Sequence, residues 1–320
     1  MHGGALKLLA NPPDMEAQIG VDFLVRSYGE SWNPATYQWY LKREFHGEAP
    51  DRLVLVDDRQ LLATAGIAYR QLLMRSGEMH RVGIMVAACV PPRERGRGRF
   101  LRLWKGAVEH CATRDCTALL GFVTADNASC VILRRARAVQ VPSWYVMSDC
   151  PPLRSTADTP RVADLAAEIA EISLSAWPDF AQAALQPQHL NAVCRFHYPS
   201  ANAWRSQFID RPHSVELLRV GDTGRAIIER VGDTDRLQWL DGNAQEQGAA
   251  VAAIVARARR ARRRFFMYST AAPGEWVPGR DCGLKARAGF IMAMATRPEH
   301  ETRVRSWPAL PWWVQSGDRL

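Results

Sequence analysis

Residues Val82–Trp104 read VGIMVAACVPPRERGRGRFLRLW, and this stretch decides the expected fold. Its first part, Val82 to Val90, is a continuous apolar run rich in valine, isoleucine and alanine, which predicts a strand buried on both faces. Two prolines and an arginine-rich turn follow, and from Phe100 the apolar spacing predicts a helix. A strand, a glycine-containing turn and a helix in this order present backbone N–H groups and the positive end of a helix to an anion.

The turn itself has the residues that an anion-binding site needs. Gly96 and Gly98 allow a positive φ and a close approach of the backbone to a ligand. Arg95, Arg97 and Arg99 add positive charge beside them. The turn lacks the Gly-Lys-Ser/Thr ending of a P-loop and the three glycines of the dinucleotide fingerprint. The alternative interpretation is an arginine-rich surface turn that happens to contain two glycines.

The spacing Arg93-x-x-Gly96-x-Gly98, after a strand that ends in Val-Pro, resembles the coenzyme A pyrophosphate loop of the GNAT (Gcn5-related N-acetyltransferase) superfamily. In that family the pattern is Gln/Arg-x-x-Gly-x-Gly/Ala at a strand-to-helix junction. The resemblance implies an α/β (α+β) fold and an acyl-CoA co-substrate, acetyl-CoA or a longer thioester. It also implies that the central strand splays from its neighbour and that pantetheine pairs with the exposed backbone. The implied coenzyme-binding residues are Ala88, Cys89, Val90, Arg95, Gly96, Arg97, Gly98 and Arg99, and the N–H of Cys89 or Val90 is the candidate oxyanion donor.

The order of the expected elements over residues 1–150 is also similar to that of the family. We expect two helices, a β-hairpin, the central strand with its loop and helix, a further strand, and a closing helix and strand. Their ranges are Asp14–Tyr28, Thr36–Phe45, Leu53–Val56, Leu61–Tyr69, Val82–Val90, Phe100–Thr113, Thr117–Val123, Cys130–Arg137 and Val139–Met147.

The closing helix departs from the family pattern Asn-x-x-Ala-x-x-x-Tyr. Asn127 and Cys130 stand at the Asn and Ala positions, and by resemblance Asn127 contacts the coenzyme. Arg134 stands where the family carries the tyrosine that usually protonates the departing thiolate. This departure favours an alternative function, an acyl-CoA sensor without turnover.

A stretch rich in proline, serine and threonine, Cys150–Pro160, predicts a linker, with a second domain over 161–320. We expect helical segments at Val162–Ala176 and Leu190–Phe208 and strands at Val215–Val220, Ala226–Val231 and Leu237–Leu240. An aromatic helix, a proline and a hairpin thus occur twice, which indicates an internal repeat. The arginines and the Gly-x-Gly are missing after the last strand. We therefore interpret the second half as a degenerate GNAT-like domain that binds the acceptor without a coenzyme loop.

Acyl transfer to an amine needs a polarised carbonyl, a neutral amine and a stabilised thiolate. Histidine suits the role of base near neutral pH, and we rank His197 before His80. Cys89 is a candidate nucleophile, although an apolar strand gives no reason for a lowered thiol pKa and favours a small core residue. For each histidine and aromatic residue a structural role is the alternative. The candidates for acceptor binding are Trp177, Tyr198, Trp204 and Asp241.

Composition limits the remaining classes. The 320 residues carry 41 basic and 33 acidic side chains, a net charge of +8, which favours anionic partners. The basic segment Arg257–Arg264 suggests RNA or an aminoacyl-tRNA as an alternative partner, but its apolar spacing favours a helix with a basic solvated face. Seven scattered cysteines without metal-type spacing predict a reduced, cytoplasmic protein without a metal. No stretch approaches eighteen apolar residues, so we expect no membrane association.

The main hypothesis is therefore an acyl-CoA-dependent N-acyltransferase with a small or medium-sized amine acceptor. Tandem GNAT halves, one intact and one degenerate, resemble several groups, among them the glycopeptide (teicoplanin-type) N-acyltransferases of antibiotic biosynthesis. That resemblance suggests an amino sugar as the acceptor.

Overall fold

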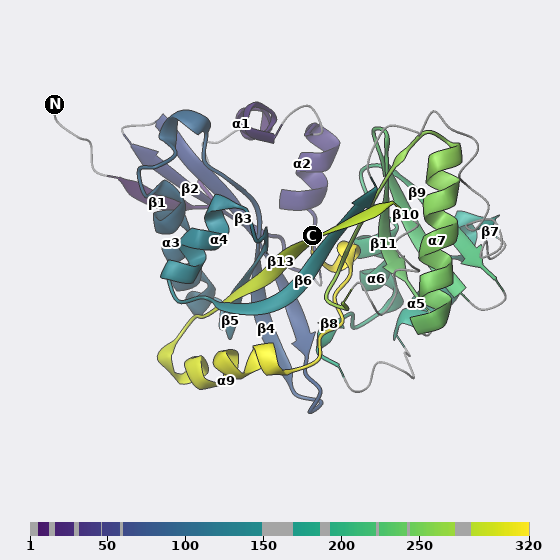
Figure 1. The fold of residues 1–320 in the computed structure, drawn as a ribbon. Helices are drawn as coiled ribbons and strands as arrows, with labels where there is room; N and C mark the ends of the chain where they lie inside the picture. Colours follow the sequence, from purple (N-terminus) through teal and green to yellow (C-terminus); the bar gives the residue numbers. More distant parts are fainter. Residues whose placement is uncertain are drawn as a thin grey trace. The chain divides into compact units, whose positions relative to one another are not determined.

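The computed structural model describes residues 6–12, 17–28, 32–45, 47–57, 60–148, 169–185, 193–221, 224–241, 244–272 and 283–319. The chain forms two compact units (Figure 1). Unit 1 comprises Met1–Val141, Phe290–Leu310 and Leu320, and unit 2 comprises Pro142–Gly289 and Pro311–Arg319. The sequence predicted a boundary near 150, with residues 161–320 in a second domain. The structure corrects this division, because Phe290–Leu310 belongs to unit 1. The predicted linker lies outside the described residues.

Unit 1 is built on a mixed sheet with the strand order β1-β2-β3-β4-β5-β13. β4 is antiparallel to β3 and parallel to β5, with α3 as the crossover between the parallel pair. The helices are α1 (Ala17–Tyr28), α2 (Pro34–Leu41), α3 (Arg99–Thr113) and α4 (Ala128–Arg135). The strands are β1 (Lys7–Ala10), β2 (Asp51–Asp57), β3 (Gln60–Leu73), β4 (Met79–Cys89), β5 (Ala118–Thr124) and β13 (Leu284–Ala295). All of these match expected elements except β1, which is too short for a clear alternation, and β13.

The sheet of unit 1 is covered on both faces. Leu53 and Leu55 of β2 point to the face packed by α3, where Leu103 and Trp104 are fully buried. Because side chains alternate along a strand, Arg52 and its same-face neighbours point the other way. That second face is covered by α1 and α2, which lie apart from α3 and α4 in Figure 1.

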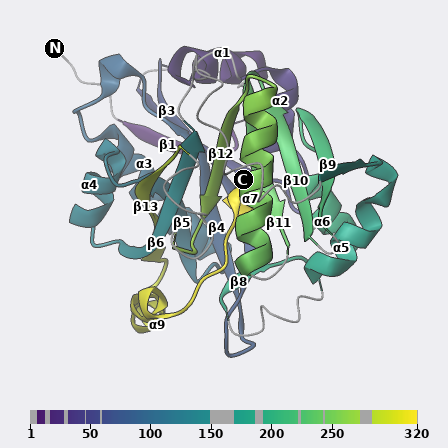
Figure 2. The same ribbon diagram turned by 45° about the vertical axis from the view of Figure 1, so that its right-hand side comes forward.

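Unit 2 repeats the same plan. Its strand order is β6-β12-β11-β10-β9-β7, with β11 and β12 parallel and α7 (Ala244–Arg260) as the crossover between them. The strands are β6 (Val139–Ser148), β7 (Ile169–Ile172), β9 (Ser214–Val220), β10 (Gly224–Val231), β11 (Thr234–Leu240) and β12 (Arg264–Ser269). Figure 2 shows α7 lying across this sheet, and its apolar side packs into the core of the unit. The series β9-β10-β11-α7-β12 parallels β2-β3-β4-α3-β5, which supports the internal repeat.

Two expected helices of unit 2 are wrong in part. Within Val162–Ala176, the described residues form the strand β7 and a short 3-10 turn. Helix α5 (Trp177–Leu185) follows this turn and carries Pro178 in its first turn, where proline is tolerated. Within 190–208, the strand β8 (Arg195–His197) comes first, and only α6 (Ala201–Phe208), capped by Ser200, is helical among the described residues.

Two strands run from one unit into the other. β6 begins in unit 1, and its residues Trp144 to Met147 pair with β12 in unit 2. β13 begins in unit 2, and its second half belongs to unit 1, where Met292 is fully buried in the core. The helix α9 (Glu301–Ser306) follows in unit 1. Within the described ranges, no helix is both long and apolar enough to cross a bilayer.

Candidate acyl-CoA site

The two central strands of unit 1 part from each other along their length. Their parallel register ends where Ile84 pairs with Leu120. Both strands continue beyond that point, β4 to Cys89 and β5 to Thr124. Along the last part of β4, the N–H and C=O groups on the edge toward β5 therefore do not pair with β5. Unpaired backbone groups of this kind bind an extended ligand as a strand would.

β4 also carries a β-bulge in this part. On its other side Gly66 of β3 lies opposite Val86, and Thr64 lies opposite Cys89, so one residue of β3 faces two of β4. Within the bulge, the φ of Ala87 is +49°, a left-handed conformation that costs roughly 1–2 kcal/mol for a non-glycine residue. Bulges re-aim the backbone locally, and strained backbone often marks a functional site. This is the segment in which the sequence placed the oxyanion donor.

The predicted anion-binding turn follows directly. Gly96 and Gly98 have φ values of +77° and +71°, as the sequence predicted. No atom lies within 4 Å of a Cβ built on either glycine, so the turn is open. The first helical hydrogen bond of α3 runs from Arg102 N to Gly98 O, 3.1 Å. The backbone N–H groups of residues 99–101 come before this bond and therefore have no acceptor within the helix. These amides and the helix dipole form a site for a phosphate.

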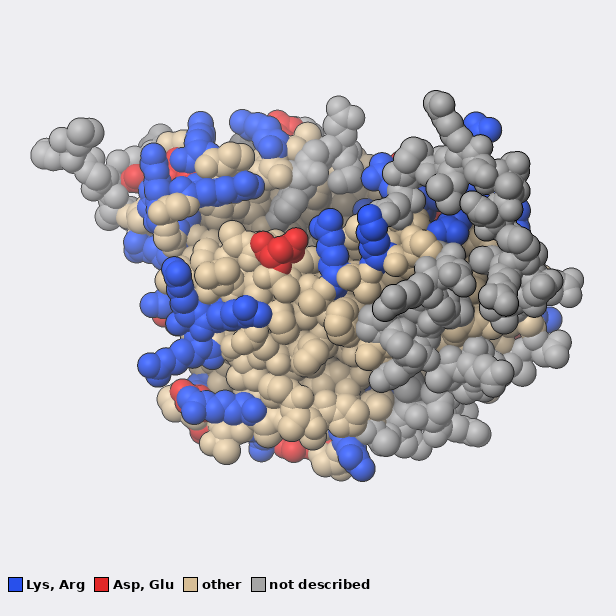
Figure 3. All heavy atoms as spheres, in the orientation of Figure 1, with Lys and Arg blue, Asp and Glu red and all other residues tan. Residues whose placement is uncertain are grey.

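The charge of this turn is more balanced than expected. Glu94 is buried, and its carboxylate lies 3.5 Å from Arg99 and 3.6 Å from Arg97. Arg95 donates through Nε to Val90 O at 3.2 Å. The arginines are thus partly held by the turn itself, and Glu94 offsets part of their charge. On the face shown in Figure 3, Lys and Arg side chains gather on the left-hand side, over unit 1.

Comparison with known proteins agrees with this geometry. No protein-family model and no curated protein sequence matches the chain. Among solved structures, a probable N-acyltransferase from Enterococcus faecalis V583 is 10% identical with a TM-score of 0.61, covering 92% of this chain and 74% of that one. A tandem GNAT protein from the clavulanic acid biosynthesis pathway is 11% identical with a TM-score of 0.60, covering 92% and 99%. A GCN5-related N-acetyltransferase from Kribbella flavida is 15% identical with a TM-score of 0.58, covering 91% and 72%.

The chain has the GNAT fold. Because these identities are low, the likeness concerns the fold, and the roles of individual residues rest on the geometry of this chain. In the part of the chain that is described, no cluster of three or more His, Cys, Asp or Glu side chains could hold a metal ion.

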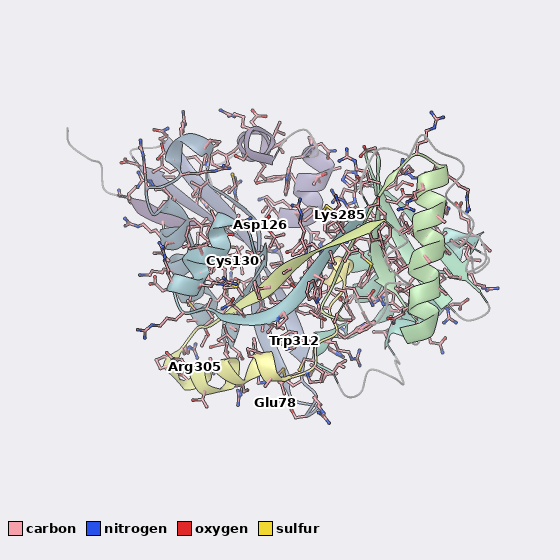
Figure 4. The ribbon with its side chains drawn as sticks, in the orientation of Figure 1. Glu78, Asp126, Cys130, Lys285, Arg305 and Trp312 are labelled. Carbon is pink, nitrogen blue, oxygen red and sulfur yellow. The ribbon has the colours of Figure 1, made fainter. Side chains whose placement is uncertain are left out.

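The closing helix of unit 1, α4, begins at Ala128, two residues before the expected Cys130. Asn127 caps α4 by accepting hydrogen bonds from the backbone N and the hydroxyl of Ser129, at 2.9 and 2.8 Å. Figure 4 labels Asp126 in the turn before this helix and Cys130, which is fully buried, within it. Arg134, at the tyrosine position, donates to Gln140 Oε1 at 2.8 Å. Its guanidinium therefore links α4 to β6.

The structure does not bring His80 together with the coenzyme loop. His80 is buried at the start of β4, 3.5 Å from Glu78 and beside Trp307. At about 3.3 Å per residue, the nine steps to Cys89 place it about 30 Å from the bulge. Burial lowers the pKa of His80, which the nearby Glu78 opposes. Figure 4 shows Glu78 at the far end of the strand, near α9.

Cys89 behaves as a small core residue rather than a nucleophile. It is 4% exposed, and burial raises the pKa of its thiol, so the reactive thiolate is disfavoured. The contribution of this position to acyl transfer would come from its backbone.

The predicted acceptor residues of unit 2 have mixed surroundings. Trp204 is fully buried against Trp239 and Phe208, and Tyr198 donates to Asp318 Oδ1 at 2.6 Å in the same core. Both are core residues, which corrects their assignment: Trp204 has no exposed surface, and Tyr198, 8% exposed, uses its hydroxyl on Asp318.

The other three candidates of unit 2 keep some exposure. Trp177, at the start of α5, lies 5.1 Å below the guanidinium of Arg205. Asp241 lies 3.4 Å from Arg225 at the end of β11. His197 ends β8, and its pKa is lowered by burial and then by Arg195. A neutral imidazole at physiological pH is what a general base requires, so His197 stays a prediction.

The basic segment is largely engaged within unit 2. Arg257 lies 2.7 Å from Glu216, Arg264 lies 2.7 Å from Asp233, and Arg263 pairs with the buried Asp235. These pairs favour the interpretation of a structural helix end over a nucleic-acid surface.

Sequence reasoning missed a polar network at the start of β2. Asp51, the first residue of β2, is buried and accepts hydrogen bonds from Tyr69, His110, Asn11 and Arg114 at 2.6–3.0 Å. Its neighbour Arg52 is also buried. Two adjacent charged residues after a proline look like a surface turn, and no local pattern reveals their burial.

Proposed function

We propose that this chain is an N-acyltransferase that moves an acyl group from the thioester of acyl-CoA to an amine. The observation that carries the proposal is the parting of β4 from β5 after Ile84, followed by an open glycine turn at a helix N-terminus. The edge of β4 suits the amide-rich pantetheine arm, and the turn suits the diphosphate. The two features are consecutive in the chain, as the two ends of one coenzyme require.

The chemistry follows from the same backbone. The carbonyl of the thioester would lie at the bulge of β4, where the N–H of Cys89 or Val90 donates to the developing oxyanion. The neutral amine attacks the carbonyl carbon, the carbon–sulfur bond breaks and the thiolate leaves. The base that receives the amine proton is His197 in this proposal or a water chain. The departing thiolate takes its proton from water, because the helix N-terminus and the arginines of the turn face the diphosphate at the other end of the coenzyme.

The acceptor is proposed as a small or medium-sized amine. The resemblance to glycopeptide N-acyltransferases suggests an amino sugar, and a role in antibiotic biosynthesis is supported by the shared fold of the clavulanic acid pathway protein. An acyl-CoA sensor is the second candidate, because Arg134 replaces the usual proton donor and is engaged locally.

A pair of glycine variants tests the coenzyme site. Gly98 and Gly77 both have φ values above +70° and open space where a Cβ would lie, but Gly77 is in the turn at the other end of β4. Gly98→Trp places an indole before the amides of α3, so we expect acetyl-CoA binding in calorimetry to weaken at least tenfold. Gly77→Trp carries the same backbone cost and should bind like the wild type.

Equal binding by the two variants and the wild type would contradict the proposed site. Thiol release from acetyl-CoA across a panel of amines then separates an enzyme from a sensor. A sensor binds acetyl-CoA with no amine-dependent thiol release.

A further inference from the structure

Arg52 is a buried cation with a single polar side-chain partner among the described residues. Its residue is 6% exposed, and its Nη1 donates to the hydroxyl of Tyr37, whose ring centroid lies 5.5 Å from the guanidinium. Its Nε and Nη2 are buried and have no hydrogen-bond acceptor in the part of the chain that the structure describes. Burial lowers the pKa of Arg52, an effect that Tyr37 partly opposes. A buried charge without a counter-ion costs several kcal/mol, so its retention calls for a reason.

The two N–H groups without an acceptor form one edge of the guanidinium. This edge is the one that binds both oxygens of a carboxylate or phosphate at once. The neighbouring Arg114 uses the same edge: its Nε and Nη2 contact the two oxygens of Asp51 at 2.9 and 3.0 Å. Two arginines of unit 1 thus present the same fork, one bound to a carboxylate of the chain and the other without one among the described residues.

Asn11 holds the backbone of Arg52, and Gly20 and Tyr37 lie against its guanidinium. Asn11 donates its backbone N–H to Arg52 O at 2.7 Å and accepts from Arg52 N at 2.8 Å. Gly20 lies in α1 directly over the guanidinium, since a Cβ there would be 2.9 Å from Nη2 and 2.9 Å from the Tyr37 hydroxyl. Glycine inside a helix costs about 1 kcal/mol relative to alanine. The chain therefore accepts two unfavourable features, a glycine and an unpaired charge, at one point.

Arg52 shares a sheet face with the bulge of β4. It lies opposite Gly66, which lies opposite Val86, and directly paired residues point to the same face. Strands are about 4.8 Å apart, so the Cα atoms of Arg52 and Val86 are about 10 Å apart. The helix α1 spans the same distance, from Gly20 over Arg52 to Ser27, whose hydroxyl interacts with the Cys89 thiol. Seven residues of helix again give about 10 Å.

We propose that Arg52, supported by Tyr37, binds an anionic group of the amine acceptor, a carboxylate or a phosphate, on the sheet face that it shares with the bulge of β4. The inference rests on the proposed function and narrows its substrate class to amines that carry an acid. Arg52 is only 6% exposed, so the proposal requires α1 to move away from the sheet when the acceptor binds.

Matched amines test the substrate class. Glucosamine 6-phosphate is compared with glucosamine, and tryptophan with tryptamine, each with acetyl-CoA. We expect the wild type to favour at least one acidic member at least tenfold in kcat/KM, mainly through a lower KM. Arg52→Met should reduce that ratio to about one, while Arg26→Met, an exposed arginine of α1, should keep it. No preference for either acid in the wild type, or an unchanged preference in Arg52→Met, would overturn the proposal. The two pairs separate a phosphate from a carboxylate.

A measurement without turnover keeps the inference independent of the proposed function. Acetate and inorganic phosphate serve as probes in thermal unfolding. We expect at least one of them to raise the Tm of the wild type by more than that of Arg52→Met, and the variant without added anion to melt at least as high as the wild type. A Tm several degrees lower would assign Arg52 a structural role, and equal shifts would also refute the site. If acetyl-CoA itself fails to bind in calorimetry, the proposed function fails. The changes in Tm caused by acetate and phosphate still test whether Arg52 binds an anion.

Discussion

Asp51 and Arg52 are adjacent in the chain, but the side chain of Asp51 has several hydrogen-bond partners and that of Arg52 has one among the described residues. Burial alone would raise the pKa of Asp51, but hydrogen bonds from His110, Tyr69 and Asn11 and the charge of Arg114 outweigh it and hold the pKa well below its usual range. Arg52, on the opposite face of β2, has only Tyr37 among the described side chains. A network in which every group is paired stabilises a fold, whereas an unpaired buried charge indicates a ligand. The comparison supports a structural role for Asp51 and the proposed binding role for Arg52.

Asp51→Asn should lower the free energy of unfolding by about 3–5 kcal/mol at pH 7, because it leaves buried partners of a carboxylate unmatched. A pKa depressed in the folded state gives stability that is present above the unfolded pKa, about 3.9, and lost as the pH falls below it. The difference between wild type and variant in urea unfolding should therefore shrink from pH 5 to pH 2. Asp115→Asn, which removes an exposed ion pair with Arg297, is the control and should cost less than about 1 kcal/mol. A constant difference across this pH range would contradict the assignment.

Single positions are predictable from sequence where backbone geometry demands a residue type. Gly96 and Gly98 are examples because a positive φ favours glycine, and Asn127 is another because a helix start favours a side-chain acceptor. Arg52 and Trp204 are not predictable in this way, since burial of one side chain depends on contacts between segments that are distant in sequence.

At the start of α4, Asn127 has two candidate roles, as the helix cap and as a contact to the coenzyme. Asn127→Ala removes the cap and should lower the free energy of unfolding by about 1 kcal/mol, whereas Asn127→Asp keeps an acceptor at the cap. If Asn127 also contacts the coenzyme, both variants should weaken acetyl-CoA binding in calorimetry, the aspartate because it repels the diphosphate. Asn33→Ala, which removes the equivalent cap of α2, supplies the matched loss of stability alone. Unchanged binding in both Asn127 variants would leave it as a cap only.

The elements that sequence predicts well are those with a strong local pattern. The buried apolar runs of β4 and β5, the hairpin strands β9 and β10 and the amphipathic α3 all match. The alanines and leucines of segment 162–176 predict a helix, but its described part pairs as β7 along Ile169 to Ile172 with β9. Strand pairing is a tertiary contact, and it overrides the helix propensity of the segment.

The arrangement of the two repeats could not be predicted, because the sequence shows two similar halves and gives no sign of their exchange. Each half contributes its last strand to the other unit: β6 pairs with β12, and the second half of β13 enters the core of unit 1 through Met292. Thr296 extends this contact by donating its N–H to Thr117 O at 3.2 Å, beside the start of β5. The two halves therefore cannot be independent folding units, although each repeats the same plan.

Expression of the halves separately tests this exchange. A fragment of residues 1–160 lacks the strand that follows β5 in the sheet and exposes the apolar surface that Met292 covers, so it should unfold without cooperativity and bind no acetyl-CoA. The fragment 161–320 supplies that strand, and co-expression of the two should yield a complex that copurifies, melts cooperatively and recovers acetyl-CoA binding. The intact chain is the positive control, and Gly98→Trp in the first fragment is the control for coenzyme binding by the complex. A monomeric 1–160 fragment that melts cooperatively and binds acetyl-CoA would refute the exchange, because its core would then be complete without the second half.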